Sequence, residues 1–382
     1  MLHKDMQLKW DNMRAGIDAQ AELLARAPRP LYAEASGLLT GPAPARLYTV
    51  GCGDSYFCGL AAEMAIELWT GQPVEALESL EFSRYAIRTA PPGSLVTAVS
   101  NSGEVARSVE SLRFARQRGL RTIGVTYNPD SRLAQAAAAI LKYDYRDVGF
   151  GPGTMSYLAS VLSLLAVGLR VAELGGALDA AGVDREIRAI EGMSPVVRET
   201  VAAAEEPAAR LAASLNEDTS IFFLGGGPNY GTALFAMAKM IESARHNTVS
   251  QQLEEWAHEQ YFCTGPGTVT VVLAPQGYAL DRAREQLRAV RDMKGTAVAV
   301  CAADDAETAA LADVVFPVPA GVPEYLSPLA YCVAAELIAY HFAVRNDKVM
   351  LGFDDEWRKE VNFRQIFRSS IPESALNVPE LA

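Results

Sequence analysis

Residues 47–69 read LYTVGCGDSYFCGLAAEMAIELW, and this stretch decides the fold because a second copy of its pattern occurs later in the chain. The second copy covers residues 221–243 and reads IFFLGGGPNYGTALFAMAKMIES, so it begins 174 residues after the first, since 221 − 47 = 174. Each copy reads as a short apolar strand, a glycine-rich turn and a long helix. Self-similarity at a fixed offset is the signature of a duplicated unit. We therefore expect two similar domains.

The same offset relates segments outside the two quoted stretches, and we expect it to stay constant. Glu81-Phe82 falls on Glu255-Trp256, and RTIGVT falls on GTAVAV. Six apolar runs are typical of central strands buried on both faces: LYTV, SLVTAVS, RTIGVT, IFFLG, TVTVVLA and AVAVC. Helical patterns, such as residues 104–117 and 282–293, alternate with them. The predicted fold class is α/β, with two tandem parallel sheets, each flanked by helices in a flavodoxin-like three-layer sandwich.

The repeat and the helical patterns around it give the expected domain boundaries. We place an N-terminal helix in residues 1–28, a first domain in 29–174 and a helical connection in 175–212. A second domain follows in 213–344, with a C-terminal tail in 345–382.

Composition excludes several classes of protein. A net charge of −12 leaves no basic face for nucleic acid. The apolar stretch 159–171 is interrupted by polar residues and is shorter than the roughly 20 residues of a membrane span. The first residues, MLHKDMQLKWDNMRAG, lack the apolar core of a secretory signal. Five scattered cysteines have no zinc-site spacing. We expect a cytoplasmic protein that contacts neither nucleic acid nor membrane.

Two turns of the first domain follow directly after predicted strands. One is Gly51-Cys52-Gly53-Asp54-Ser55, and the other is Ser100-Asn101-Ser102-Gly103-Glu104. In parallel sheets, ligands bind beyond the carboxyl ends of the strands, and hydroxyls with nearby backbone amides suit a phosphate. The alternative is that Ser102 caps the helix that follows. Spacing alone does not decide between the two.

The turns GCGDSY and SNSGEVARSVE, with GGGPNY in the second copy, resemble the sugar isomerase (SIS) domain family. This family includes the isomerase half of glucosamine-6-phosphate synthase and the fructosamine-phosphate deglycases. The resemblance covers essentially the whole chain after about residue 30. It implies that the first-domain turns hold the phosphate of a sugar, with contacts from Gly53, Ser55, Ser100, Asn101, Ser102 and Glu104.

Three positions depart from the pattern of the family. Asp54 and Val105 stand where threonines are usual, so a carboxylate is added beside the expected phosphate and a hydroxyl is lost. A third loop, residues 151–157, resembles the sugar-contacting S-T-K segment, which implies that Thr154 contacts substrate, but Met155 takes the place of the lysine.

The second domain carries the expected acid and base groups. Lys239 and Glu242 lie three residues apart on one face of a predicted helix, and His258 follows Glu242 by sixteen residues, since 242 + 16 = 258. The K-x-x-E pair and this spacing resemble the catalytic segment of the family. The resemblance implies that Glu242 moves a proton between C1 and C2, and that His258, from the neighbouring subunit of a homodimer, helps to open the sugar ring. Lys239 is expected either to orient Glu242 or to neutralise charge on an enediolate. Glu255 is a secondary candidate for substrate contact, or a structural residue shared by both repeats, and His246 has a weaker claim.

Without the resemblance, a K-x-x-E pair is usually a solvated helical pair, and a single histidine is more often structural than catalytic. In the tail, Arg368 aligns with a lysine that forms a Schiff base in the synthases. An arginine cannot form an imine, so it is left with contacts to phosphate or carboxylate.

These features favour a sugar-phosphate isomerase or deglycase that acts on an amino-sugar phosphate or a fructosamine 6-phosphate, with deamination of an amino-sugar phosphate as a further possible reaction. No glutamine-hydrolysing segment is evident, so glutamine-dependent synthesis is not expected. GCGDSY lacks the complete G-x-G-x-x-G pattern of dinucleotide sites, and we expect no cofactor and no metal. The alternative is a non-catalytic regulator that binds a sugar phosphate.

Overall fold

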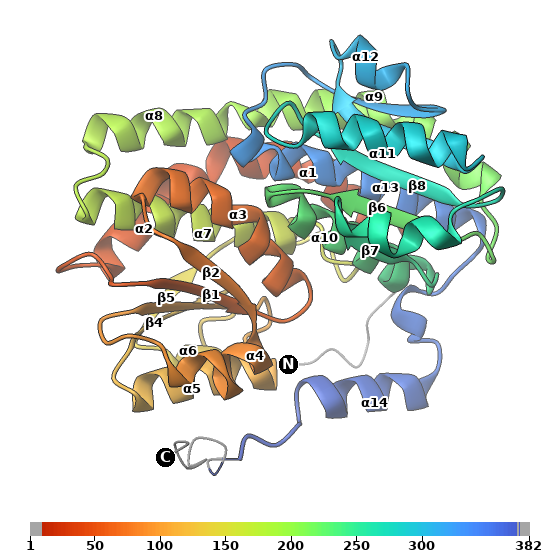
Figure 1. Cartoon of the computed structure of the whole chain (residues 1–382). Coiled ribbons are helices and arrows are strands. Elements are labelled where there is room, and N and C mark those ends of the chain that lie inside the picture. Colours follow the sequence, from red (N-terminus) through yellow and green to blue (C-terminus); the bar gives the residue numbers. More distant parts are fainter. Residues whose placement is uncertain (1–9, 373, 375–382) are drawn as a thin grey trace. The chain divides into compact units, whose positions relative to one another are not determined.

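The computed structural model describes residues 10–372 and 374, and its chain divides into two compact units (Figure 1). We name each unit after the copy of the repeat that it contains. The first-half unit comprises Ala27–Tyr145, Ala159–Ile187 and Asp355–Ala382, and the second-half unit comprises Met1–Arg26, Arg146–Leu158 and Arg188–Asp354. Parts of the expected N-terminal helix, residues 1–9, and of the expected tail, residues 373 and 375–382, lie outside the described residues.

The first-half unit is built on a five-stranded parallel sheet. Its strands are β1 (Leu47–Gly51), β2 (Val74–Glu78), β3 (Leu95–Val99), β4 (Arg121–Thr126) and β5 (Ala139–Lys142). They lie in the order β2-β1-β3-β4-β5, and every neighbouring pair is parallel. The three central strands β1, β3 and β4 are buried almost throughout, because helices cover both faces of the sheet.

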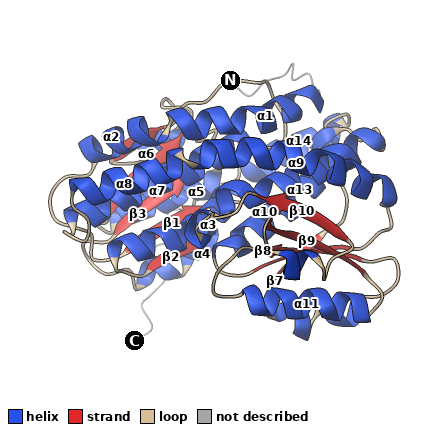
Figure 2. Ribbon diagram, turned by 90° about the horizontal axis from the view of Figure 1, so that it is seen from above, coloured by secondary structure: helices blue, strands red, loops and turns tan. Residues whose placement is uncertain are grey.

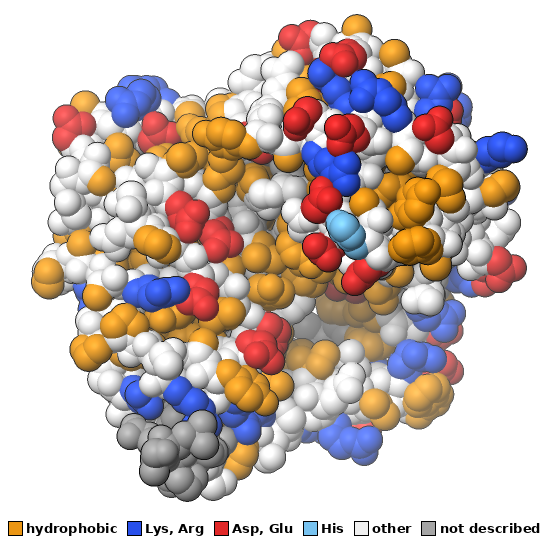
Figure 3. Space-filling view, viewed as in Figure 1, with side chains coloured by type: hydrophobic (Ala, Val, Ile, Leu, Met, Phe, Trp, Pro, Cys, Tyr) orange, Lys and Arg blue, Asp and Glu red, His pale blue; other side chains and the backbone are white. Residues whose placement is uncertain are grey.

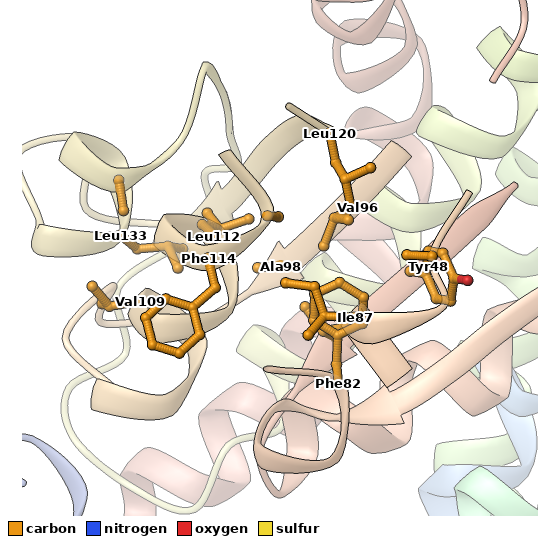
Figure 4. Packing of buried hydrophobic residues seen from close by; sticks show 14 residues of the cluster. Tyr48, Phe82, Ile87, Val96, Ala98, Val109, Leu112, Phe114, Leu120 and Leu133 are labelled. Atoms are coloured by element: carbon orange, nitrogen blue, oxygen red, sulfur yellow. The ribbon is translucent and has the colours of Figure 1, made fainter. Parts of the chain in front are cut away.

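Helices form the outer layers of this unit. They are α2 (Pro28–Leu38), α3 (Asp54–Thr70), α4 (Ser79–Arg84), η1 (Ala86–Arg88), α5 (Ala106–Gln117), α6 (Arg132–Ala136), α14 (Glu356–Ile366), and the parts of α7 (Met155–Leu174) and α8 (Ala180–Glu191) that belong to this unit. One face of the sheet packs against α4, η1, α5 and α6, where Phe82, Ile87 and Phe114 lie against apolar side chains of β1 and β3 (Figure 4). The opposite face meets α3 and α7, whose Ile66 and Gly168 are in contact.

The second-half unit repeats this architecture. Its parallel sheet contains β6 (Ile221–Gly225), β7 (Val249–Gln252), β8 (Val269–Ala274), β9 (Thr296–Ala302) and β10 (Val314–Val318), in the order β10-β9-β8-β6-β7. Helix α11 lies on one side of β8 and β9, and α10 and α13 lie on the other (Figure 2).

The helices of the second-half unit include long core helices and several single turns. They are α1 (Trp10–Arg26), α9 (Met193–Ser214), α10 (Pro228–Ala244), α11 (Leu280–Asp292), α12 (Ala306–Ala309), α13 (Pro328–Arg345), η2 (Glu255–His258), η3 (Gln260–Cys263), η4 (Glu324–Leu326) and η5 (Met350–Gly352). If β1 to β5 are matched to β6 to β10 in chain order, the two sheets have the same strand order. The duplicated α/β fold predicted from the sequence is therefore confirmed.

The expected constant offset of the repeat is wrong for the later strands. Leu95 lies opposite Arg121 of β4, whereas its counterpart Val269 lies opposite Thr296 of β9, and 296 − 121 = 175. The extra residue lies in the helix before β9, because α5 has 12 residues and α11 has 13. Both helices begin at the original offset, at Ala106 and Leu280.

Helix α7 contains the apolar stretch 159–171. Among the described helices it alone has the length and the apolar composition that could cross a membrane, and 89% of its most apolar window is buried inside the protein. That burial is typical of the core helix of a globular domain.

Candidate active site

The turn after β1 is shaped by a glycine that no other residue could replace without strain. Gly53 has φ 55° and ψ −130°, immediately before α3, and this conformation is essentially restricted to glycine. A β-carbon on Gly53 would meet no atom within 4 Å, so the space in front of the turn is open. Ser55 lies in the first turn of α3 and is half-buried. The turn therefore leaves room for a ligand beside the start of the helix.

Ser100 lies at the carboxyl end of β3, and its side-chain hydroxyl is buried without a hydrogen-bond partner among the described residues. The residue is 1% exposed. A buried hydroxyl without a partner is costly unless something else binds it. The Ser100 hydroxyl is therefore left as an unused hydrogen-bond donor at the carboxyl end of β3.

Two tyrosines orient the amide of Asn101. Tyr143 and Tyr145 donate from their hydroxyls to Asn101 Oδ1, at 3.0 and 3.2 Å. Burial raises the pKa of Tyr143, so its hydroxyl keeps its proton and remains a donor. With Oδ1 occupied, the amide nitrogen of Asn101 faces away from the tyrosines as a donor. Sequence analysis missed this pair, because the contact joins residues more than forty positions apart.

The alternative of Ser102 as the cap of the following helix is wrong. Helix α5 begins at Ala106, its N-cap residue is Val105, and no side chain caps it. Ser102 Oγ instead accepts from the backbone N–H of Glu104 at 3.2 Å, so it closes the turn itself.

Glu104 and the C-terminal segment meet at Arg132. The Arg132 side chain donates to Glu104 Oε2 at 2.9 Å, to the Glu104 carbonyl at 2.5 Å and to the Phe367 carbonyl at 2.6 Å. Arg107 similarly donates to the carbonyl of Ser370. Arg368 is exposed and pairs with Glu360 at 3.2 Å. The segment after α14 thus runs beside the Ser100–Glu104 turn, and two arginines that sequence analysis did not single out hold it there.

A third turn at the same edge of the sheet contains Arg132, and its position after a strand could have marked Arg132 as a candidate site residue. The residues YNPDSR follow β4, and turns after parallel strands gather at one edge.

In the second-half unit, Lys239 and Glu242 are in direct contact on α10. Lys239 Nζ lies 2.5 Å from Glu242 Oε2 and 3.4 Å from the Gly153 carbonyl. Lys239 is fully buried, whereas Glu242 is 29% exposed. A buried ammonium needs such partners, and here it fixes the carboxylate in one orientation while leaving it open to solvent. The pair is therefore not a solvated surface pair.

The Lys239 contact also fixes the loop that contains Thr154. Thr154 is 3% exposed, and its hydroxyl packs against Gly16 of α1. Met155 is buried as well. The departure from the lysine of the family thus places an apolar side chain in the protein interior.

His258 and Glu255 lie at the surface of the second-half unit. His258, in η2, is 67% exposed, and its Nε2 lies 3.3 Å from Glu254, which also pairs with Arg282. On the surface over α11 and α12, positively and negatively charged side chains lie next to one another (Figure 3). The structure therefore pairs His258 with Glu254 and not with Glu242.

Glu255 has the same local environment as its repeat counterpart Glu81. Gln252 accepts from the backbone N–H of Glu255, as Glu78 accepts from that of Glu81, in both cases at 3.3 Å. This shared contact belongs to the backbone, and both carboxylates remain exposed.

His246 is buried beside Phe342, and its Nδ1 lies 2.8 Å from Thr248 Oγ1. Burial lowers its pKa, so the ring is neutral near pH 7. In the described part of the chain, no group of three or more His, Cys, Asp or Glu side chains is arranged to hold a metal ion.

Comparison with known proteins shows similarity over most of the chain. The family model of the SIS domain matches residues 43–170 and 214–345. The glutamine–fructose-6-phosphate aminotransferase (isomerizing) of Mycobacterium bovis is 28% identical over 301 residues, which is 77% of this chain and 47% of that protein. The chain thus spans about half the length of the curated relatives it matches.

Solved structures share the fold at lower identity. Tagatose-6-phosphate ketose/aldose isomerase from Escherichia coli superposes with a TM-score of 0.74 and 17% identity, covering 90% of this chain and 94% of that one. Glucosamine-6-phosphate deaminase from Thermotoga maritima superposes with a TM-score of 0.68 and 18% identity, covering 88% and 96%.

Proposed function

The chain belongs to the SIS domain family, and we propose that it is a sugar-phosphate isomerase or deglycase. In this proposal the turns after β1 and β3 bind the phosphate, and Glu242 moves a proton between C1 and C2 of an open-chain sugar. The substrate is an amino-sugar phosphate or a fructosamine 6-phosphate. The names of all three similar proteins contain a hexose 6-phosphate, which supports this substrate class.

The contact between Lys239 and Glu242 carries the catalytic part of the proposal. Proton transfer from a weakly acidic C–H requires a carboxylate held in one position and reachable by the substrate. The fully buried ammonium holds one carboxylate oxygen at 2.5 Å, and Glu242 keeps 29% of its surface exposed. The same ammonium favours the negative charge that develops on an enediolate nearby.

The phosphate part of the proposal is supported by Ser100, Asn101 and Gly53. The buried Ser100 hydroxyl lacks a partner among the described residues, the Asn101 amide is oriented by two tyrosines, and Gly53 leaves open space before α3. Asp54 makes the turn less favourable for a dianion, so binding depends on these neutral donors and on the backbone.

Arg368 favours reactions that need no lysine imine. An arginine remains protonated and cannot attack a carbonyl. In a fructosamine 6-phosphate the substrate already carries an amine. Proton transfer from C1 to C2 turns it into an imine between C1 and that amine, and water then hydrolyses the imine to release the amine and an aldose 6-phosphate. We also infer that the tail borders the site near Phe367, because Arg132 joins Glu104 to the Phe367 carbonyl.

We further infer that His258 acts on a neighbouring subunit of a homodimer. Its ring is 67% exposed, and within the described part of the chain its one ion-pair contact is with Glu254, at 3.3 Å, so a partner's sugar can reach it. An imidazole can accept or donate a proton at its ring nitrogens.

The test measures proton exchange and turnover together. The purified chain is incubated in D₂O with fructosamine 6-phosphates, glucosamine 6-phosphate and hexose 6-phosphates, and NMR follows both product and deuterium at C1 and C2. Glu242→Gln should abolish both signals, whereas Glu206→Gln, which removes an exposed carboxylate paired with Arg210, should not.

The outcomes separate the candidate functions. Exchange that requires Glu242 supports the enzyme and identifies its substrate class. Saturable binding of a sugar phosphate, with no exchange in the wild-type protein, would instead indicate a non-catalytic regulator.

A further inference from the structure

The second-half unit contains a counterpart of the first-half phosphate turn with the same backbone geometry. Gly227 precedes α10 with φ 52° and ψ −132°, while Gly53 precedes α3 with φ 55° and ψ −130°. In each turn a glycine two residues earlier, Gly51 or Gly225, lies close to the backbone of the helix that follows. A β-carbon on either glycine would overlap that backbone. The duplication therefore reproduces the shape of the turn as well as the strand before it.

A carboxylate of the chain itself lies at the turn after β8, residues 275–278, and approaches the Gly227 turn. Glu324, in η4 after β10, accepts a hydrogen bond from the backbone N–H of Tyr278 at 3.0 Å. Its carboxylate lies directly over Gly277, where any β-carbon would overlap it. Its Oε1 is also 3.8 Å from the position that a β-carbon of Gly227 would take. The turns after β6 and β8, which contain Gly227 and Gly277, thus face the same carboxylate.

The first half has a different arrangement at the matching amide. Tyr278 corresponds to Glu104, since 278 − 104 = 174. In the first half the amide of Glu104 donates to the Ser102 hydroxyl within its own turn. In the second half the residue at the Ser102 position is Gln276, and the amide instead donates to the carboxylate from the β10 loop.

A chain of hydrogen bonds holds Glu324 in place. Ser327 Oγ donates to the Glu324 carbonyl at 2.6 Å, and Asn229 Nδ2 donates to Ser327 Oγ at 2.6 Å. Asn229 is fully buried and occupies the position that Ser55 has in the first half, since 229 − 55 = 174. The residue at the position of a predicted phosphate ligand thus supports the loop that carries Glu324.

We propose that Glu324 is an internal anion that fills the second-half counterpart of the phosphate site, so that the chain binds a phosphate group in its first half only. Backbone amides and glycines that favour an anion in one half are satisfied in the other by a carboxylate on a neighbouring loop. Removing this carboxylate should uncover a second site for phosphate. The comparison of the two halves rests on the proposed function, but the occupancy of the second turn does not.

The test measures the stoichiometry of inorganic phosphate binding by isothermal titration calorimetry, with ³¹P NMR as a second readout. Glu324→Ala should bind about one more phosphate per chain than the wild-type protein, because the vacated turn admits the anion. Glu324→Gln removes the charge at nearly constant size and should show the same gain with weaker affinity. Glu307→Ala removes an exposed carboxylate of the same unit, paired with Arg284, and should not change the stoichiometry.

A Ser100→Ala background separates this inference from the proposed function. If the first-half turn does not bind phosphate, the wild-type protein and Ser100→Ala both bind none. The Glu324 variants should still bind one phosphate per chain, with or without Ser100→Ala. Circular dichroism establishes that each variant is folded. Folded Glu324→Ala and Glu324→Gln proteins with the phosphate stoichiometry of the wild type would overturn the inference.

Discussion

At the scale of single residues, the buried lysine of α10 gives the most direct prediction. Replacing Lys239 by Met keeps most of the aliphatic stem but removes the ammonium, which lies 4.8 Å from the centre of the Phe235 ring and holds Glu242. Because the carboxylate then loses its fixed orientation, we expect kcat to fall on the order of 10²-fold. Steady-state kinetics on the substrate found in the D₂O panel measure the change.

The matched control for Lys239→Met is Lys348→Met. Lys348 belongs to the same unit and also pairs with a glutamate, Glu217, at 2.6 Å, but it is not part of the proposed site. We expect its kcat to stay within about twofold of the wild type. Equal losses in the two variants would contradict the assigned role of Lys239.

Ser100 gives a second prediction, in which stability and binding change independently. Its buried hydroxyl has no partner among the described residues, so Ser100→Ala should leave the free energy of unfolding unchanged or slightly higher. If that hydroxyl donates to a phosphate, KM should rise about tenfold, because one hydrogen bond to a charged group is lost. Kinetics and urea denaturation together test both statements.

Ser111→Ala is the control for this experiment. Ser111 is also buried, but its hydroxyl donates to the carbonyls of Ser79 and Arg107, at 2.9 and 3.0 Å. Its loss should lower the free energy of unfolding by about 1 kcal/mol and leave KM unchanged. A normal KM in Ser100→Ala would refute the proposed phosphate contact.

At the scale of elements, the accuracy of sequence analysis depended on the position of each strand. The six strands predicted from apolar runs are the three central strands of each sheet, and all six are confirmed. The four that it did not identify, β2, β5, β7 and β10, are the edge strands. Their burial is mixed, because one long side of each lacks a neighbouring strand, so their residues include polar ones such as Ser250 and Gln251 of β7. Continuous apolar runs therefore identified the central strands and could not identify the edge strands.

Sequence spacing also predicted local contacts better than distant ones. The three-residue spacing of Lys239 and Glu242 predicted a shared helix face, and the two side chains are in contact. The links from Arg132 to Phe367 and from Tyr143 to Asn101 join distant segments, and no local pattern indicated them. The roles of these residues in binding or catalysis remain predictions.

The paired turns before α3 and α10 give an element-scale prediction. Gly53 and Gly227 share a conformation that costs other residues about 1–3 kcal/mol. Gly53→Ala and Gly227→Ala should therefore lower the free energy of unfolding by similar amounts within that range. Only Gly53→Ala should raise KM for the sugar phosphate, since the Gly227 turn already faces Glu324, whose Oε1 is 3.8 Å from the position that a β-carbon of Gly227 would take. A raised KM in Gly227→Ala alone would reverse the assignment of the two halves.

At the scale of the whole molecule, duplication let two copies of one fold take different roles. The first-half unit carries the donors proposed for phosphate, and the second-half unit carries the Lys239–Glu242 pair. The corresponding positions in the other copy differ: Ser55 is matched by Asn229, and Ser102 by Gln276. The two sheets have the same strand order, and the residues that differ lie in the turns at the carboxyl ends of the strands.

The pH dependence of the stability of the whole chain should reveal a carboxyl group that is unrelated to the proposed site. Burial, and then the nearby charge of Glu67, raise the pKa of Glu63 on α3 to about 7 from a usual value of 4.5. A pKa raised in the folded state means that folding favours the protonated form. This contribution to stability is fully present below pH 4.5 and is lost as the pH rises through about 7.

Glu63→Gln mimics the protonated carboxyl at every pH, so its advantage over the wild type should appear only as the pH rises. At pH 8 we expect its free energy of unfolding to exceed that of the wild type by about 1–2 kcal/mol, after allowing for the screening of a half-buried group. At pH 4.5 the two proteins should be nearly equal. Urea denaturation at both pH values measures the difference, with Glu81→Gln as a control at an exposed carboxylate of the same unit. An advantage that is the same at both pH values would mean that the pKa of Glu63 is the same in the folded and the unfolded protein, and that water relieves its burial.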